Sequence, residues 1–379
     1  MRKDWQYKKL GDISSSLLIE KAKKRFNPND VIRYIDISSI DNINQRLIGT
    51  TSFKMLDAPS RAQQKVEYGD ILISTVRPNL RNIAIVNDDS SNLVASSGFC
   101  VLRINDAALR RYIFYYVVSN KFTAYLGKLT NGANYPAVKE TDVRKAFIPI
   151  PPKSTQLSIV SELDKLNELI RIKKEQLKDY DTLAQSIFYE MFGDPVVNEK
   201  GWEVKLLKDV STLLNGRAYK QQELLDKGKY KVLRVGNFFT NSTFYYSDLE
   251  LDDDKYSEYG DLLFAWSASF GAFIWNGDKV IYHYHIWKVL FDKDCLDIQY
   301  YRYLLNTMTS FFMNDVHGIG MVHLTKSGME QYNLPIPPLP LQQSFAQKIE
   351  QIEQQKAAIQ KTITDLETLL AARMQYWFD

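Results

Sequence analysis

The sequence predicts an α+β (mixed α/β) protein in which two pseudo-repeated globular domains are joined by two long helices that pair as an antiparallel coiled coil. Three observations predict this fold. A seven-residue pattern of apolar positions covers about 37 residues in the middle of the chain, the same pattern returns at the carboxyl end, and the segments before the two patterns share motifs in the same order.

The first long helix is predicted over residues 156–192, between a proline-rich segment at 148–152 and the sequence Gly193-Asp194-Pro195. Nine of the eleven positions on one heptad-spaced stripe are apolar or aromatic, and the intervening positions are rich in Lys, Glu, Asp and Gln. A helix of this length spans roughly 55 Å. Because its narrow apolar stripe cannot be hidden alone, a partner helix is expected.

The partner is predicted in the same chain. At an offset of 186 residues the proline-rich segment recurs at 334–338, and the apolar stripe follows it without a gap to Phe378. Antiparallel pairing is expected, because a parallel pair would need a connection as long as the helices themselves. The stripe residues expected to pack between the two helices are Leu163, Ile170, Leu177, Ile187, Ile349, Ile352, Ile359, Ile363 and Leu366.

The segments that precede the helices repeat each other. Residues 5–14 match residues 202–211 at an offset of 197, and Tyr-Gly-Asp-Ile-Leu at 68–72 matches Tyr-Gly-Asp-Leu-Leu at 259–263 at an offset of 191. The expected division of the chain has four segments: a first globular domain at 1–147, a proline-rich turn and central helix at 148–194, a second globular domain at 195–333, and a second turn and helix at 334–379.

Each globular domain is predicted to mix strands with helix. In the first domain, β-branched and apolar runs predict strands at 70–74, 83–86 and 99–102, and one helix is predicted near 110–119. The second domain repeats the third of these strands at 287–290. A domain of about 140 residues can bury its own core.

Composition narrows the class of protein. No run approaches 18 apolar residues and the first residues form no signal sequence, so a cytoplasmic location is expected. Cys100 and Cys295 are the only cysteines and have no CxxC spacing, which excludes a disulfide framework.

The charge is unevenly distributed along the chain. Residues 1–152 carry 23 Lys and Arg against 14 Asp and Glu, whereas residues 195–333 carry 15 against 18. This basic excess favours a nucleic-acid-binding function, although a basic surface can also serve solubility alone.

Two polar loops of the first domain are candidates for reading DNA bases. The loop at 74–82 combines arginine, which pairs with guanine, with asparagine, which pairs with adenine, and the loop at 130–136 adds further amides. Solvated turns without a binding role are the alternative for both. The candidate DNA-binding residues are Ser74, Arg77, Asn79, Arg81, Asn82, Asn131, Asn134, Tyr135 and Lys139.

The second domain places aromatic and polar groups at matching points, in the segments 266–270 and 318–323. Its candidates are Arg217, Lys220, Trp266, Ser267, Ser269, His285, His323 and Lys326. Of the 48 aromatic residues, 25 lie between 195 and 333; most must be core, and some could meet bases or sugars. The spacing of His283 and His285 fits one face of a strand, but no Cys or carboxylate lies at ligand spacing, so no metal site is predicted.

No catalytic motif is found. The chain has no GxxxxGK[ST] phosphate loop, and both Pro-Pro pairs follow Ile instead of the Asn or Asp expected in an amino-methyltransferase. Asp194 with Glu203-Val204-Lys205 resembles the acid and E-x-K cluster of a nuclease. The first copy has Gln6-Tyr7-Lys8 at the matching place, so the cluster is not repeated. We therefore predict that the chain is not an enzyme.

The order of globular domain, Pro-Pro turn and long helix, used twice and with Tyr-Gly-Asp-[Ile/Leu]-Leu in each domain, resembles the specificity (S) subunits of type I restriction-modification systems. The resemblance implies two target-recognition domains, each reading one half of a split DNA sequence, and helices that dock two methyltransferase (modification) subunits. It also implies restriction/translocase subunits as partners. S-adenosylmethionine, ATP and Mg would then belong to the partners, with no cofactor in this chain and no membrane contact.

A different class of function also fits the helices. A coiled-coil scaffold could bridge two protein partners without sequence-specific DNA binding. The basic excess of the first domain and its arginine and asparagine loop weigh against that alternative.

Overall fold

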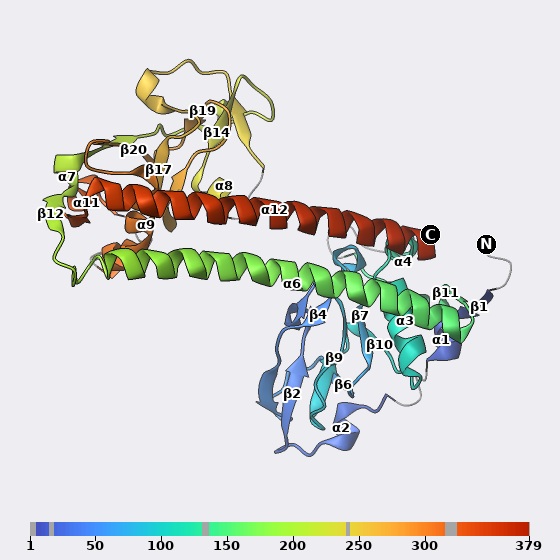
Figure 1. The fold of residues 1–379 in the computed structure, drawn as a ribbon. Helices are drawn as coiled ribbons and strands as arrows, with labels where there is room; N and C mark the ends of the chain where they lie inside the picture. The colour runs from blue at the N-terminus through green and yellow to red at the C-terminus, as the bar shows by residue number, and fades with distance from the viewer. Residues whose placement is uncertain (1–4, 15–18, 131–135, 240–242, 315–323, 379) are drawn as a thin grey trace. The chain divides into compact units, whose positions relative to one another are not determined.

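The computed structural model describes residues 5–14, 19–130, 136–239, 243–314 and 324–378 (Figure 1). The chain divides into two compact units, unit 1 with Met1–Lys174 and Lys361–Asp379, and unit 2 with Glu175–Gln360. The long helices α6 (Lys153–Phe192) and α12 (Leu339–Phe378) each contribute one part to each unit. Within the described residues, no helix is both long enough and apolar enough to span a bilayer.

The remaining elements of unit 1 follow the chain from its amino terminus to α6. They are β1 (Gln6–Lys9), α1 (Leu10–Ile13), α2 (Ala22–Arg25), β2 (Val31–Ile35), β3 (Ile40–Asp41), β4 (Arg46–Leu47), β5 (Thr51–Lys54), β6 (Ala62–Lys65), β7 (Ile71–Ser74), β8 (Ile83–Ile85), β9 (Leu93–Ser96), β10 (Phe99–Leu102), α3 (Ala107–Val117), α4 (Asn120–Gly127), α5 (Glu140–Lys145) and β11 (Phe147–Ile150).

The remaining elements of unit 2 lie between the two long helices. They are β12 (Glu203–Leu206), α7 (Leu207–Val210), β13 (Ser211–Asn215), β14 (Tyr230–Leu233), α8 (Val235–Phe239), β15 (Tyr245–Ser247), β16 (Tyr256–Ser257), β17 (Leu262–Ser267), β18 (Ser269–Ile274), β19 (Val280–Tyr282), β20 (Ile286–Phe291), α9 (Ile298–Thr307), α10 (Thr309–Asn314), α11 (Lys326–Met329) and β21 (Asn333–Ile336).

In unit 1 the described strands form a sheet in the order β10–β7–β8–β4–β3 and a second sheet in the order β5–β2–β9–β6. The four residues of β7 are all buried, because the strand has apolar neighbours on both faces. Ile71 and Ile73 pack against the cluster that contains α3, whereas Leu72 packs into the cluster that contains residues of β9. The mixed α/β class is thereby confirmed.

Unit 2 repeats this plan with β13–β20–β17–β18 and β15–β14–β19–β16 as its described sheets. Phe264 and Trp287 pack toward α9 and the long helices, and Leu263 and Ile286 pack on the opposite face with β19. In both units one face of a central strand meets helices and the other meets the second sheet.

The repeated Tyr-Gly-Asp motif forms the same turn in both units. Gly69 and Gly260 both have φ +90, a conformation that residues with a Cβ rarely adopt. The Asp70 carboxylate accepts a hydrogen bond from the amide three residues earlier at 2.9 Å, and Asp261 does the same at 2.7 Å. The motif is therefore a structural turn that starts β7 and β17.

The proline-rich segments are strands and not only turns, which corrects the sequence interpretation. β11 pairs antiparallel with β1, and β21 pairs antiparallel with β12. The hydroxyl of Tyr112 donates to the carbonyl of Pro149 at 2.8 Å, and that of Tyr300 donates to the carbonyl of Pro335 at 2.8 Å. Proline lacks an N–H but keeps its carbonyl, so these edge strands still accept hydrogen bonds.

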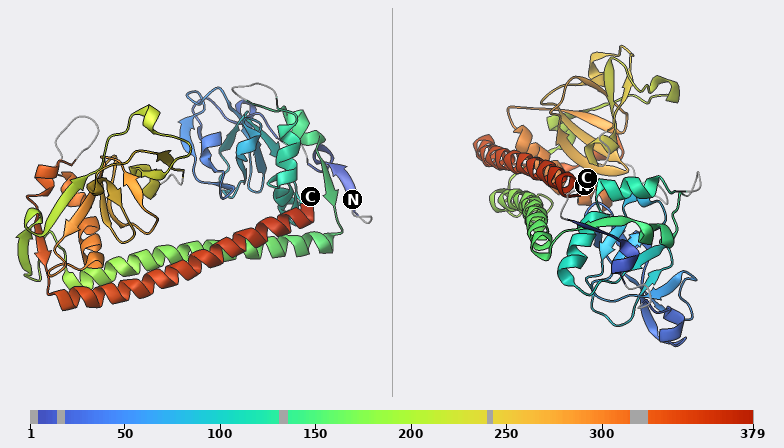
Figure 2. Two further views of the ribbon diagram at one scale, coloured as in Figure 1. Left: turned by 90° about the horizontal axis from the view of Figure 1, so that it is seen from above. Right: turned by 90° about the vertical axis from the view of Figure 1, so that its right-hand side faces the viewer.

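The long helices run antiparallel within each unit, as predicted. In unit 1, Lys174 pairs with Glu367 at 2.8 Å, and Glu162 nearer the start of α6 pairs with Arg373 nearer the end of α12. In unit 2, Asp181 pairs with Lys356 at 2.7 Å. Within each unit, the parts of the two helices lie side by side (Figure 2).

None of the nine predicted stripe residues is fully exposed. Leu163, Ile170, Ile349, Ile352 and Ile363 are buried, and the remaining four stripe residues are half-buried. The first helix begins at Lys153, three residues before the predicted start, because the helical turn directly follows the prolines.

The helix predicted near 110–119 corresponds to α3, and a further helix follows it. α3 ends at Val117, and the side chain of Ser119 accepts a hydrogen bond from the amide of Phe122 at 3.3 Å, so Ser119 caps a new helix, α4. The predicted strands at 70–74, 83–86 and 99–102 correspond to β7, β8 and β10.

Candidate nucleic-acid interface

The loop between β7 and β8 has an unusual backbone. Arg77 and Arg81 have φ values of 47 and 53, in the left-handed region, and a 3-10 turn at Pro78–Leu80 lies between them. Such conformations cost of order 1–3 kcal/mol for residues other than glycine and concentrate at functional sites. The two arginines therefore mark the ends of a constrained loop.

Backbone hydrogen bonds hold this loop in place. The amide of Thr75 donates to Gly98 at 2.9 Å, the amide of Val138 donates to Thr75 at 2.9 Å, and the amide of Arg77 donates to Pro136 at 2.7 Å. The loop is thus tied to the start of β10 and to the described end of the second predicted loop.

Arg81 lies over a cavity of about 430 Å³ in unit 1. Its Nη2 donates to Oδ1 of Asn120 at 2.5 Å, and Arg46 and Arg111 also line the cavity. Arg111 is engaged by Asp164 of α6, with Nε and Nη2 at 2.9 and 2.6 Å from the same carboxylate oxygen. The cavity combines guanidinium groups with apolar side chains such as Phe114. Sequence reasoning missed this cluster, although the polar run at 41–46 was a usable signal.

The other candidates of unit 1 fall into three groups. Arg77, Asn79 and Lys139 are exposed. Ser74 and Asn82 are buried, and the Ser74 hydroxyl donates to the carbonyl of Val76 at 2.8 Å inside the loop, so the structure gives the Ser74 side chain a role in holding the loop. Three further candidates lie outside the described residues: Asn131, Asn134 and Tyr135.

In unit 2 the corresponding connection is a tight hairpin, in which Ala268 alone separates β17 from β18 and has φ 64. The amide of Trp266 donates to His285 at 3.1 Å, and the amide of Leu324 donates to Trp266 at 3.4 Å. These hydrogen bonds match those made by Thr75 in unit 1. The same scaffold therefore presents a long loop in one unit and a short hairpin in the other.

Aromatic rings gather beside this hairpin. The rings of Trp266 and Trp287 stack with centroids 5.3 Å apart and an interplanar angle of 18°, and His285 meets Trp266 edge-on at 5.1 Å. Nε1 of Trp266 donates to the carbonyl of Tyr284 at 2.9 Å, which fixes the indole. The rings line a cavity of about 370 Å³ together with Asn215, Leu324, Thr325 and Lys326.

His283 belongs to a second cavity on the other side of His285. Burial lowers the pKa of His283 to about 4, and the neighbouring His285 and Arg234 lower it in the same direction, so the ring is neutral near pH 7. The cavity has a volume of about 370 Å³ and is also lined by Asn237 and Ser267. Among the described residues, no three His, Cys, Asp or Glu side chains are grouped as metal ligands.

Arg217 is held by an internal partner. Its Nη1 and Nη2 donate to the two carboxylate oxygens of Glu223 at 3.0 and 2.7 Å, and these hydrogen bonds lower the pKa of Glu223 to about 2. Lys220 and Lys326 are exposed, Ser269 is half-buried and Ser267 is buried. His323 lies outside the described residues.

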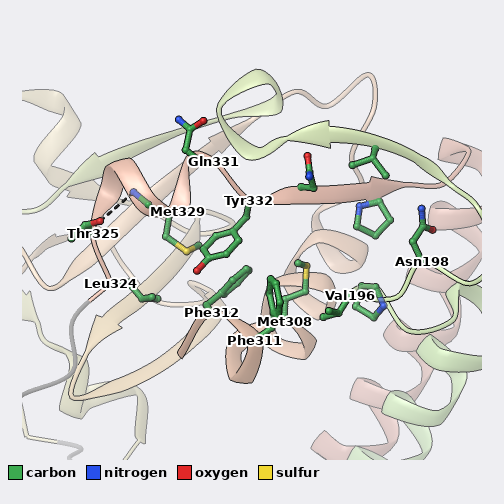
Figure 3. Close-up of a pocket in the computed structure, with 15 residues that line it drawn as sticks. Val196, Asn198, Met308, Phe311, Phe312, Leu324, Thr325, Met329, Gln331 and Tyr332 are labelled. Carbon is green, nitrogen blue, oxygen red and sulfur yellow. Dashed lines mark hydrogen bonds between the residues drawn. The ribbon is translucent and has the colours of Figure 1, made fainter. Parts of the chain in front are cut away.

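A larger cavity of unit 2, of about 860 Å³, has a different character (Figure 3). Met308, Phe311, Phe312 and Tyr332 point into it, and none of the described residues that line it carries a charged side chain. A cavity without cations is a poor site for phosphates. The candidate interface is therefore placed at the β7–β8 and β17–β18 connections and not at this cavity.

Comparison with known proteins identifies the family of both units. The family described as type I restriction modification DNA specificity domain matches residues 2–179 and again residues 199–368. The specificity subunit of the type I restriction enzyme MjaIX of Methanocaldococcus jannaschii is 24% identical over 407 residues, which cover 97% of this chain and 91% of that protein. The HindI specificity subunit of Haemophilus influenzae is 27% identical over 194 residues, which cover 50% of this chain and 41% of that protein.

Solved structures share the fold. A chain from a study of complex assembly and conformational transition of the type I R-M system aligns with a TM-score of 0.64 at 23% identity, covering 99% of this chain and 97% of that one. The type I restriction-modification S subunit from M. genitalium aligns with a TM-score of 0.52 at 12% identity, covering 99% of this chain and 96% of that one. The family match covers most of the sequence in two copies, and the chain therefore belongs to the type I restriction modification DNA specificity domain family.

Proposed function

We propose that this chain is the DNA-reading subunit of a type I restriction-modification complex, in which each unit reads one half of a bipartite target. One observation carries the proposal. The two units share the hydrogen bonds that hold the β7–β8 and β17–β18 connections, yet these connections differ in length and chemistry. A constant scaffold with different side chains at one place is what two independent base readers need.

The long helices are the proposed docking surface for two methyltransferase subunits. Several apolar side chains on them face outward: Leu157, Leu169, Leu183 and Leu369 are 45 to 50% exposed. Exposed leucines along a helix favour contact with another protein. Catalysis then belongs to the partners, which would bind S-adenosylmethionine, ATP and Mg, and the complex would work on cellular DNA in the cytoplasm with restriction/translocase subunits.

The decisive test is a genome-wide map of methylated adenines in cells that carry the methyltransferase with and without this chain. We expect one bipartite motif that requires the chain. Replacing residues 1–147 by the matching domain of a relative should change one half of that motif and preserve the other. If both halves changed together, the units would not read independently.

A coiled-coil scaffold that binds proteins alone predicts a different result in vitro. The assembled complex should shift duplex DNA in a salt-dependent manner, because phosphate contacts weaken as counterions accumulate. Absence of any salt-dependent shift would favour the scaffold.

A further inference from the structure

We propose that the aromatic cavity of unit 2 holds one base of its half-site outside the duplex stack. The cavity is defined by Trp266, Tyr284, His285 and Trp287. The inference rests on the proposed function and adds to it the chemistry by which unit 2 recognises DNA.

The scaffold does not require the rings of Trp266 and His285. The amide of Trp266 bonds to His285 as the amide of Thr75 bonds to Gly98, so Thr75 and Gly98 occupy the matching positions in unit 1. Trp287 lies two residues after His285, where unit 1 has Cys100 two residues after Gly98. A fold that forms with Thr and Gly at the positions of Trp266 and His285 does not need an aromatic ring at either, whereas Trp287 belongs to the core of unit 2 and supports Trp266.

The rings are arranged as a stacking platform. Trp287 is 1% exposed and supports Trp266 in a nearly parallel stack, while the hydrogen bond from Trp266 Nε1 to Tyr284 keeps the indole from turning. His285 forms an edge-on wall at 5.1 Å. A flat, fixed aromatic surface binds the face of a base without losing side-chain freedom on binding.

A paired base could not use this platform. In a duplex a base shows only its edges to the grooves, whereas ring-lined cavities take the flat faces of bases that have left the stack. The rim supplies Asn215 for a base edge and Lys326 for a phosphate. The surrounding segment 195–333 has 15 Lys and Arg against 18 Asp and Glu, so binding here depends less on phosphate attraction than in unit 1.

The test uses the full complex of this chain with its methyltransferase and the target found by methylation mapping. Each base pair of the two half-sites is mismatched in turn by changing the base on one strand. Removal of pairing lowers the cost of extruding a base, so the complex should bind tighter, by about tenfold or more, to a mismatch at one position of the unit 2 half-site. The methylated position is set aside, because methyltransferases themselves extrude their target base.

The test variant is Trp266→Thr, which introduces the residue that unit 1 carries at the matching position. The control is Trp275→Thr, in the same unit. The indole Nε1 of Trp275 donates to the carbonyl of Asp278 at 2.8 Å, and Trp275 does not line the cavity. Trp266→Thr should weaken binding about 5- to 150-fold and abolish the gain from the mismatch. Trp275→Thr should keep that gain. Thermal melting of both variants reports whether the unit remains folded. If Trp266→Thr unfolds the unit, His285→Gly is used in its place.

Two results would overturn the inference while leaving the proposed function intact. One is specific duplex binding in which no mismatch of the unit 2 half-site increases affinity. The other is a gain from the mismatch that survives Trp266→Thr. If the wild-type complex bound no duplex at all, the proposed function would fail and this inference would fail with it.

Discussion

Glu162 in the amino-terminal part of α6 and Arg373 near the end of α12 form an ion pair, with Arg373 Nη2 at 2.9 Å from Glu162 Oε2. The indole Nε1 of Trp377 donates to the same oxygen at 3.0 Å. The next residue, Phe378, is buried, and its ring lies 5.5 Å from that of Tyr112. The last turn of α12 is therefore an integral part of unit 1.

This ion pair gives a stability that depends on pH. The hydrogen bonds from Arg373 and Trp377 lower the pKa of Glu162, so its contribution is present above the unfolded pKa of about 4.3 and is lost as pH falls through the lower folded value. Both side chains are 32% exposed, so Glu162→Gln should cost about 1 kcal/mol or less at pH 7. Urea unfolding should show a larger difference between variant and wild type at pH 7 than at pH 3.

Glu168→Gln is the matched control for that experiment. Glu168 pairs with Arg171 on the same helix, and the pair joins no two elements. It should change the unfolding midpoint less than Glu162→Gln does. Equal effects would mean that the link between α6 and α12 contributes no particular stability.

A second stability prediction concerns the contact between α6 and the core of unit 2. Phe188 is fully buried, and its ring lies 5.9 Å from Tyr300 and 5.7 Å from Phe345. Phe188→Ala should destabilise unit 2 by about 3–5 kcal/mol, because it leaves a cavity among aromatic side chains. Tyr189→Ala, at a neighbouring position that is 44% exposed, should have a much smaller effect in the same denaturation assay.

Much of this fold could be predicted because its signals are local or repeated. The long helices could be predicted from the seven-residue period of their apolar residues. The two units could be predicted from motifs such as Tyr-Gly-Asp, which needs glycine at φ +90 in each copy. The strand character of the proline-rich segments was missed, because it depends on pairing between β1 and β11, which are about 140 residues apart. Phe188 was missed for a similar reason, since it lies off the stripe and faces a globular core instead of the other helix.

The candidate site was harder to predict than the fold. Arg77 was expected in a polar loop, and its side chain is exposed. The burial of Ser74 and the pairing of Arg217 with Glu223 depend instead on the folded environment. The stacking of Trp266 on Trp287 likewise joins neighbouring strands that are distant in the sequence. Residue type indicates which side chains could contact DNA, and tertiary contacts decide which of them are accessible to do so.

The constrained loop of unit 1 predicts a specific effect on DNA reading. Arg77 is exposed at one end of the loop, so Arg77→Ala should relax or abolish reading of the unit 1 half-site, with a loss of roughly 1–3 kcal/mol for a bidentate base contact. Methylation mapping should show the unit 2 half-site unchanged. Arg171→Ala removes an exposed arginine of α6 that pairs with Glu168, and serves as the control for loss of charge. A uniform loss of affinity on all sequences would instead assign Arg77 to phosphate contact.

The last prediction concerns helix length. α6 and α12 each contribute to both units, so we expect the number of unread base pairs between the half-sites to depend on the length of the helical segments. Seven residues should be inserted into α6 between Lys174 and Asp181, and seven into α12 between Lys356 and Glu367, so that both ion pairs keep their partners.

Seven residues add about 10.5 Å of helix, and a base pair occupies about 3.4 Å, so methylation maps should show a spacer longer by about three base pairs with the same half-sites. The apolar stripe keeps its phase under this change, because the insertion equals one heptad. A four-residue insertion at Asp179 alone adds about 6 Å but also rotates the stripe, so it should cost stability as well as shift the spacer. Full activity of the double insertion at the original spacing would show that helix length does not set the spacer, and altered half-site bases would show that the helices also influence base reading.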